Sequence, residues 1–212
     1  QVTPDEGAPY EITAEKGIVL ATGSSCRPLG FIEMNGDTTI DSDDILNLSD
    51  VPESLIVLGA GAVGTEFASI FSRFGSKVTL VEVMSHILPI EDQEVSEELA
   101  RVLKKQGIDV LTSAKVENVR SLKDSVKVAI ETEAGAKEIT ASKLLVAAGR
   151  QPRTANIGLE NTAVQVNDRG FIEVDAYMQT GEKGVYAIGD IIPTAMLAHL
   201  GSHEGLLAVD HL

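Results

Sequence analysis

Three glycines in this 212-residue sequence have a spacing that suits one kind of chemistry. Gly59, Gly61 and Gly64 directly follow the apolar run "SLIVL", and an amphipathic stretch begins after them. In a G-x-G-x-x-G turn between a strand and a helix, the glycines allow a tight turn, close approach of a diphosphate, and close packing of the helix on the strand. The free N–H groups at the start of the helix favour an anion. We therefore predict a dinucleotide diphosphate site here.

An acidic residue follows at the spacing that this motif requires. The next apolar run, "KVTLVE", ends in Glu82, where a carboxylate can accept hydrogen bonds from the adenosine ribose hydroxyls. A 2′-phosphate would meet like charge at Glu82, and the next residues, "VMS", supply no Arg for it. We therefore predict binding of NAD(H) rather than NADP(H). The alternative is a glycine-rich turn that a glutamate happens to follow.

The elements that must position these residues alternate along the chain. The apolar spacing predicts a helix over 62–74, with Val63, Phe67, Ile70, Phe71 and Phe74 on its buried face. A second helix is predicted over 92–106, with Asp92 as its N-cap. Strands "SLIVL", "KVTLVE" and "IDVLT" surround the two helices. This strand–helix alternation predicts an α/β, Rossmann-like parallel sheet.

The pattern changes to short β runs over 115–142, which predicts an antiparallel β-meander. Upstream of the glycine motif we predict an edge strand at 11–14 and a short buried strand at 18–21. The last segment contains the run "GVYAIGD", which ends in Asp190, and an apolar, helix-like stretch over 195–212. A carboxylate at the end of a buried strand is costly unless a partner accepts its charge.

Composition and charge exclude several classes of function. The 17 basic and 32 acidic residues give a net charge of −15, which disfavours nucleic acid and anionic membrane surfaces as partners. No apolar run has the length of a membrane span. The single cysteine, Cys26, allows no internal disulfide. With no signal peptide in the first residues, we expect a cytoplasmic location. We predict no metal site.

These motifs together resemble one family. The segments "GAGAVGTE…VTLVE", "AAGRQP" and "MLAH", in this order, are similar to those of the flavin-dependent pyridine nucleotide–disulfide oxidoreductases. The resemblance covers essentially the whole sequence. It implies a discontinuous FAD-binding domain interrupted by an NAD-binding domain. Residues 1–49 would end the first FAD-domain segment, 50–152 would form the NAD-binding domain, and 153–212 would return to the FAD domain.

The resemblance also assigns cofactor contacts, motif by motif. It places Glu66 near the contact between nicotinamide and flavin. The implied NAD contacts are Gly59, Ala60, Gly61, Ala62, Val63, Gly64, Thr65, Glu66, Glu82, Val116 and Gly149. The implied FAD contacts are Thr22, Gly23, Ser24, Asp190, Met196, Leu197, Ala198 and His199. Asp190 would bind the ribityl chain, and we expect it to face solvent or an empty cleft when the flavin site is incomplete.

The resemblance implies electron flow from a dihydrolipoyl dithiol through an enzyme disulfide and FAD to NAD⁺. A homodimer and a lipoyl domain of a 2-oxo acid dehydrogenase complex are the implied partners. The redox cysteine pair and the His–Glu pair of the family fall outside these residues, so we expect this central portion to contain no catalytic residue and to be inactive alone. His203 and Glu204 are assigned no catalytic role. The alternatives are a mercuric reductase, a transhydrogenase or an NADH oxidase of the same family, or a non-catalytic NAD-binding module.

Overall fold

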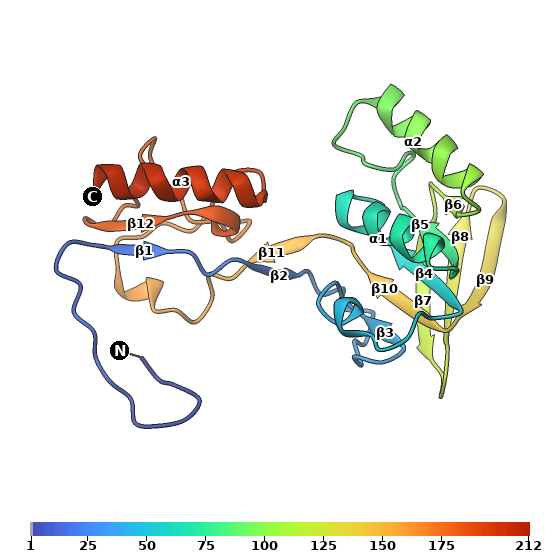
Figure 1. Ribbon diagram of the computed structural model, residues 1–212, viewed down its shortest axis with the longest axis horizontal. Helices are drawn as coiled ribbons and strands as arrows, with labels where there is room; N and C mark the ends of the chain where they lie inside the picture. The colour runs from blue at the N-terminus through green and yellow to red at the C-terminus, as the bar shows by residue number, and fades with distance from the viewer. Residues whose placement is uncertain (1) are drawn as a thin grey trace. The chain divides into compact units, whose positions relative to one another are not determined.

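The computed structural model describes residues 2–212, which form two compact units (Figure 1). One unit contains residues 26–150, and the other combines the segment up to Ser25 with residues 151–212. The chain passes between the units at β2 (Ser24–Cys26) and β11 (Arg150–Pro152), which form a two-stranded sheet. The first boundary between the two units lies earlier in the sequence than residue 49, because β3 (Thr39–Ile40) belongs to the sheet of the unit 26–150.

A parallel five-stranded sheet forms the centre of the unit 26–150. The helices α1 (Ala62–Arg73) and α2 (Gln93–Lys105) are the crossovers that connect its strands. Leu58 is in register with Val81 on one side and Val146 on the other, so three strands end at the same edge. The strand order is β3, β10 (Lys143–Val146), β4 (Ser54–Leu58), β5 (Lys77–Val81), β6 (Asp109–Leu111).

Different elements cover the two faces of this sheet: the helices pack on one face and the meander on the other. Leu55 and Val57 of β4 belong to a buried cluster that includes residues of α1 and α2. Ile56 and Leu58, which point the other way, belong to a cluster with the meander. Both faces are therefore buried, which explains why β4 is apolar at successive positions rather than at alternating ones. The helices and the meander lie near this sheet in Figure 1.

The meander consists of β7 (Lys115–Ser121), β8 (Val126–Thr132) and β9 (Gly135–Ala141), paired antiparallel. Val126, Val128 and Ile130 are buried against the parallel sheet, whereas the residues between them are partly exposed. The predicted α/β fold, a Rossmann-like parallel sheet with an antiparallel meander, is confirmed. The segment 42–48 contains only the short 3₁₀ helix η1 (Ile45–Asn47).

The buried face of α1 differs from the predicted one. Ile70 and Phe74 are 42% and 64% exposed, whereas Gly64, Thr65 and Ala68 are buried. Phe71, a member of the predicted face, is buried in the cluster with the sheet, and Phe67 packs against that cluster. The prediction is therefore right for Phe71 and wrong for Ile70 and Phe74, because small residues occupy much of the close contact between helix and sheet. The prediction for α2 is confirmed: Asp92 is its N-cap, and the Asp92 side chain accepts a hydrogen bond from the N–H of Glu94 at 2.9 Å.

The other unit is built on two parallel strands, β1 (Ile18–Leu20) and β12 (Val185–Ala187). Its helix α3 (Ala198–His211) begins later than the predicted helix start at 195. The short 3₁₀ helices η2 (Leu159–Asn161) and η3 (Gly189–Ile191) complete its elements. Its buried cluster is formed by Val164, Ile172, Ala187, Ile191 and Ile192.

Two strand predictions in this unit are wrong. Residues 11–14 form no strand, and Ile12 is exposed. β1 exists but is not buried: Ile18 is 48% exposed, because β12 is the only strand paired with β1 in the part of the chain that the structure describes. None of the helices within residues 2–212 is long and apolar enough to cross a membrane.

Candidate functional site: a nucleotide turn and a strand-end carboxylate

The glycine turn lies where β4 ends and α1 begins. Gly59 has φ +99°, a backbone conformation that side chains rarely adopt, and a Cβ there would lie 2.5 Å from the carbonyl oxygen of Ala147. The Gly59 N–H donates to the Val81 carbonyl at 2.8 Å. The turn is therefore held between β10 and β5, at the edge where the carboxyl ends of the strands meet. In open α/β sheets, ligands bind at this edge.

The two later glycines have different roles. A Cβ at Gly64 would overlap the carbonyl oxygen of Gly59, so Gly64 lets α1 pack against the turn. Gly61 is the N-cap of α1, and a Cβ there would meet nothing within 4 Å. No side chain caps this helix, so its first N–H groups are available to a ligand. Open space in front of uncapped N–H groups fits a diphosphate.

Glu82 lies beside the turn, at the end of β5. It is 6% exposed, and its two carboxylate oxygens accept hydrogen bonds from backbone N–H groups: Oε2 from Ala60 at 2.7 Å and Oε1 from Met84 at 2.9 Å. The Glu82 carbonyl also accepts from the N–H of Ala114 at 2.9 Å. The same acid that the motif assigns to a ribose thus connects the turn to the segment after β5.

The remaining predicted NAD contacts lie on the same unit. Val116 is buried near the start of β7, two residues after the contact between Ala114 and Glu82. Gly149 follows β10, the neighbour of β4, and has φ +114°. Glu66 is exposed and lies in the second turn of α1, which begins at Ala62.

The predicted FAD contacts gather on the other unit, at the carboxyl ends of β1 and β12. Ser24 Oγ donates to Asp190 Oδ2 at 2.5 Å, although 166 positions separate them in the sequence. Thr22 Oγ1 donates to the Arg153 carbonyl at 2.6 Å. Asp190 is half-buried, and the Ser24 hydroxyl is a partner for its carboxylate that the sequence did not indicate.

At the start of α3, backbone N–H groups have no side-chain partner. Leu197 is the N-cap of α3, it is 50% exposed, and no side chain caps the helix. Ala198 and His199 are exposed at the first turn. Uncapped N–H groups beside exposed residues fit the FAD contacts that the resemblance implies at 196–199.

One buried acid in this unit was not predicted from the sequence as part of the site. Glu204 of α3 is 5% exposed, and its carboxylate accepts from the Gly189 N–H at 2.7 Å and from Thr194 Oγ1 at 2.8 Å. His203, the residue before it, is exposed. A signal existed in the sequence: Gly201, Gly205 and Ala208 repeat at helical spacing, and Glu204 falls on the same face of the helix.

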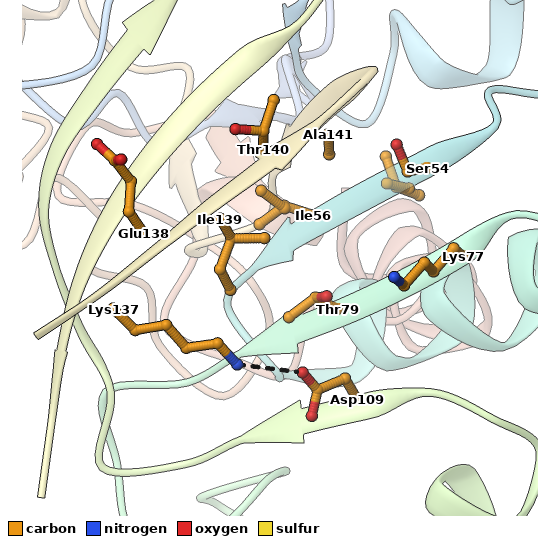
Figure 2. Close-up of a pocket in the computed structure, with 11 residues that line it drawn as sticks. Ser54, Ile56, Lys77, Thr79, Asp109, Lys137, Glu138, Ile139, Thr140 and Ala141 are labelled. Carbon is orange, nitrogen blue, oxygen red and sulfur yellow. Dashed lines mark ion pairs between the residues drawn. The ribbon is translucent and has the colours of Figure 1, made fainter. Parts of the chain in front are cut away.

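A separate pocket of about 270 Å³ lies at the opposite edge of the parallel sheet (Figure 2). Ser54, Lys77 and Asp109, the first residues of β4, β5 and β6, line it, and Lys137 Nζ lies 3.6 Å from Asp109 Oδ2 across it. The glycine turn and Glu82 are at the other ends of these strands. This pocket is therefore not the predicted nucleotide site.

Comparison with known proteins supports the same assignment. Over residues 2–205 the chain matches the family described as pyridine nucleotide-disulphide oxidoreductase. It is 42% identical to a dihydrolipoyl dehydrogenase of Bacillus subtilis, over 97% of this chain and 44% of that protein. It is 39% identical to a mitochondrial dihydrolipoyl dehydrogenase of Sus scrofa, over 94% of this chain and 40% of that protein.

A solved structure gives the same result. The HOCl-induced flavoprotein disulfide reductase RclA of Escherichia coli superposes with a TM-score of 0.84 at 33% identity, over 92% of this chain and 44% of that chain. The chain thus spans under half the length of the relatives that it matches. The glycine turn, the strand-end acid and the match over residues 2–205 lead to one conclusion: this chain belongs to the pyridine nucleotide-disulphide oxidoreductase family.

Proposed function

We propose that this chain is the NAD(H)-binding central portion of a flavoprotein that reoxidises dihydrolipoamide. The observation that carries the proposal is the uncapped start of α1 at Gly61, next to the carboxylate of Glu82. Together they offer N–H donors for a diphosphate and an acceptor for ribose hydroxyls. The similarity to dihydrolipoyl dehydrogenases supports the substrate.

The preference for NAD(H) follows from the lone pairs of Glu82. An ionised carboxylate has about four acceptor sites. The N–H groups of Ala60 and Met84 use two of them, which leaves acceptors for the 2′- and 3′-hydroxyls of a ribose. A 2′-phosphate is an acceptor without a proton to donate there, and it carries like charge. NADPH is therefore expected to bind more weakly than NADH.

The flavin site is proposed for the other unit. The Asp190 carboxylate, oriented by Ser24, would accept hydrogen bonds from ribityl hydroxyls, and the backbone of 196–199 would face the ring. A bound flavin supplies the chemistry that accepts electrons from a dithiol and passes them on as hydride. The residues of this chain bind and orient the two cofactors, and Glu66 is proposed to lie close to their contact.

For the whole protein we propose a homodimer that accepts dihydrolipoamide from a lipoyl domain of a 2-oxo acid dehydrogenase complex. The cytoplasmic location expected from the sequence remains a prediction.

Calorimetry on the 212-residue chain tests the nucleotide proposal. NADH is expected to bind at millimolar or lower concentration, and NADPH is expected to bind at least about tenfold more weakly, as a like-charge contact of about 1.4 kcal/mol requires. An absence of heat with millimolar NADH would contradict the proposal. A longer protein carrying this chain should reduce NAD⁺ with dihydrolipoamide, which tests the substrate separately.

A second candidate is a flavoprotein disulfide reductase with another substrate, which the structural similarity to RclA favours. The same longer protein distinguishes the two. Reduction of NAD⁺ by dihydrolipoamide supports the first proposal. Oxidation of NADH by other disulfides or by metal ions, without activity on dihydrolipoamide, supports the second.

A further inference from the structure

The buried face of α3 contains an unexpected charge. Gly201, Gly205 and Ala208 let this helix lie close to the η3 turn: a Cβ at Gly201 would lie 3.4 Å from Gly189 Cα, and Ala208 is fully buried. Glu204 lies among them, 5% exposed. None of the ion pairs found among residues 2–212 involves Glu204. A buried carboxylate without a cationic partner is costly, so its hydrogen bonds require an explanation.

Those bonds join both ends of one turn. Gly189 begins the turn and donates its N–H to Glu204 Oε2 at 2.7 Å, and Thr194 ends it and donates its hydroxyl to Oε1 at 2.8 Å. Asp190 lies between them, next to Gly189. Two fully buried residues, Ile191 and Ile192, anchor the same turn to the core. One carboxylate therefore fixes both ends of the segment that carries Asp190.

We propose that Glu204 is a positioning residue for the flavin, which holds the Asp190 turn in a set place relative to the first turn of α3. Gly189 has φ +70°, so the direction of the chain into Asp190 depends on a conformation that a hydrogen bond at its N–H stabilises. Because Glu204 is itself part of α3, the turn and the segment 196–199 are held by one helix. The proposal rests on the proposed flavin site.

The chemistry of glutamine provides a conservative variant. In Glu204→Gln, the amide oxygen can accept from Gly189, and the amide N–H₂ can donate to Thr194, because a hydroxyl both accepts and donates. Both contacts therefore survive the loss of charge. In Glu204→Ala both are lost. Ala208→Gly is the matched control, since it weakens the same buried face of α3 without touching the carboxylate.

The first test uses amide hydrogen exchange on the 212-residue chain and needs no cofactor. Glu204→Ala is expected to raise the exchange rate of the Gly189 amide roughly tenfold or more, because the Gly189 N–H loses its acceptor. Glu204→Gln and Ala208→Gly should leave it within about threefold of the unmodified chain. If Glu204→Ala and Ala208→Gly raise the exchange rate of the Gly189 amide equally, the positioning role of Glu204 is wrong, because general loosening of α3 would explain both rates.

The second test measures FAD affinity by reconstituting the apo form of the longer flavoprotein that carries this chain. Glu204→Ala should weaken FAD binding roughly tenfold, and Glu204→Gln should restore it. If the unmodified protein binds no FAD, the proposed function fails, whatever the exchange result. If the unmodified protein binds FAD and Glu204→Ala binds it as tightly as the unmodified protein does, the positioning role fails and the flavin site stands.

Discussion

The carboxylate of Glu82 accepts a hydrogen bond from the backbone N–H of Ala60 at 2.7 Å, from inside the glycine turn itself. The strand-end acid is thus part of the scaffold that shapes the phosphate turn, as well as the residue assigned to the ribose. The N–H of Met84 donates to its other oxygen at 2.9 Å. This double use has a consequence for mutagenesis: a change at Glu82 alters stability and nucleotide binding together.

Glu82→Gln is therefore expected to lower the stability of the unit 26–150. An amide has one acceptor oxygen, so one of the two backbone N–H groups would face an N–H₂ group and lose its partner. The expected cost is about 1–3 kcal/mol in the free energy of unfolding, measured by urea denaturation. Glu133→Gln, at an exposed turn, makes the same charge change and should have little effect. If Glu82→Gln and Glu133→Gln lower the free energy of unfolding equally, the two hydrogen bonds of Glu82 make no specific contribution to stability.

Two glycine substitutions should separate binding from stability. Gly64→Ala places a Cβ against the Gly59 carbonyl and is expected to cost about 1–3 kcal/mol of stability. Gly61→Ala places a Cβ in open space at φ −71°, so its cost should stay under about 1 kcal/mol. The same Cβ occupies the approach of the diphosphate and should weaken NADH binding at least roughly tenfold.

Urea denaturation and calorimetry on both glycine variants measure these effects. A Gly61→Ala protein that keeps full NADH affinity would show that the diphosphate does not lie in front of Gly61, and it would remove the main support for the nucleotide site.

Ser24→Ala should weaken flavin binding through Asp190. The Ser24 hydroxyl donates to Asp190 Oδ2, so its loss leaves that carboxylate less well oriented for ribityl hydroxyls. FAD affinity of the longer flavoprotein should fall roughly tenfold, measured by reconstitution of the apo form. Ser25→Ala, one position further along β2, is the matched control. Similar losses in both variants would point to disturbance of the strand rather than to the hydroxyl.

A pH-dependent contact on α2 gives a test that is independent of the cofactors. The hydrogen bond from Arg101, aided by its charge, lowers the pKa of Glu98 below its ordinary value. The stability that the pair contributes is therefore present above the unfolded-state pKa of Glu98 and is lost as pH falls through the lower folded-state pKa. Arg101→Ala should raise the pKa of Glu98, as followed by NMR titration of its side-chain carboxyl carbon.

Lys104→Ala removes the same charge from α2 without removing the hydrogen bond, and it should move the pKa of Glu98 less. Both side chains of the pair are largely exposed, so high salt should reduce the part that charge contributes.

The sequence by itself determined the nucleotide motif and the order of elements around it. These features are local patterns in the sequence. The glycine spacing precedes α1, the acid follows β5, and the change from helical to alternating periodicity marks the β7–β9 meander. The buried face of α1 was not predictable in this way. Apolar spacing selected Phe71 correctly, but it also selected Ile70 and Phe74, which are exposed. Close packing on the sheet buries the small residues Gly64 and Ala68 as well.

Only the tertiary structure decided the partners of the carboxylates. Ser24 and Asp190 meet because β1 and β12 are parallel neighbours, a pairing across most of the chain that no local pattern contains. From the sequence, Glu204 was assigned no catalytic role. The small residues of α3 bring the Glu204 carboxylate against the Gly189 turn. Whether a charged side chain is buried depends on the elements that pack around it, and these are not visible from its position in the sequence.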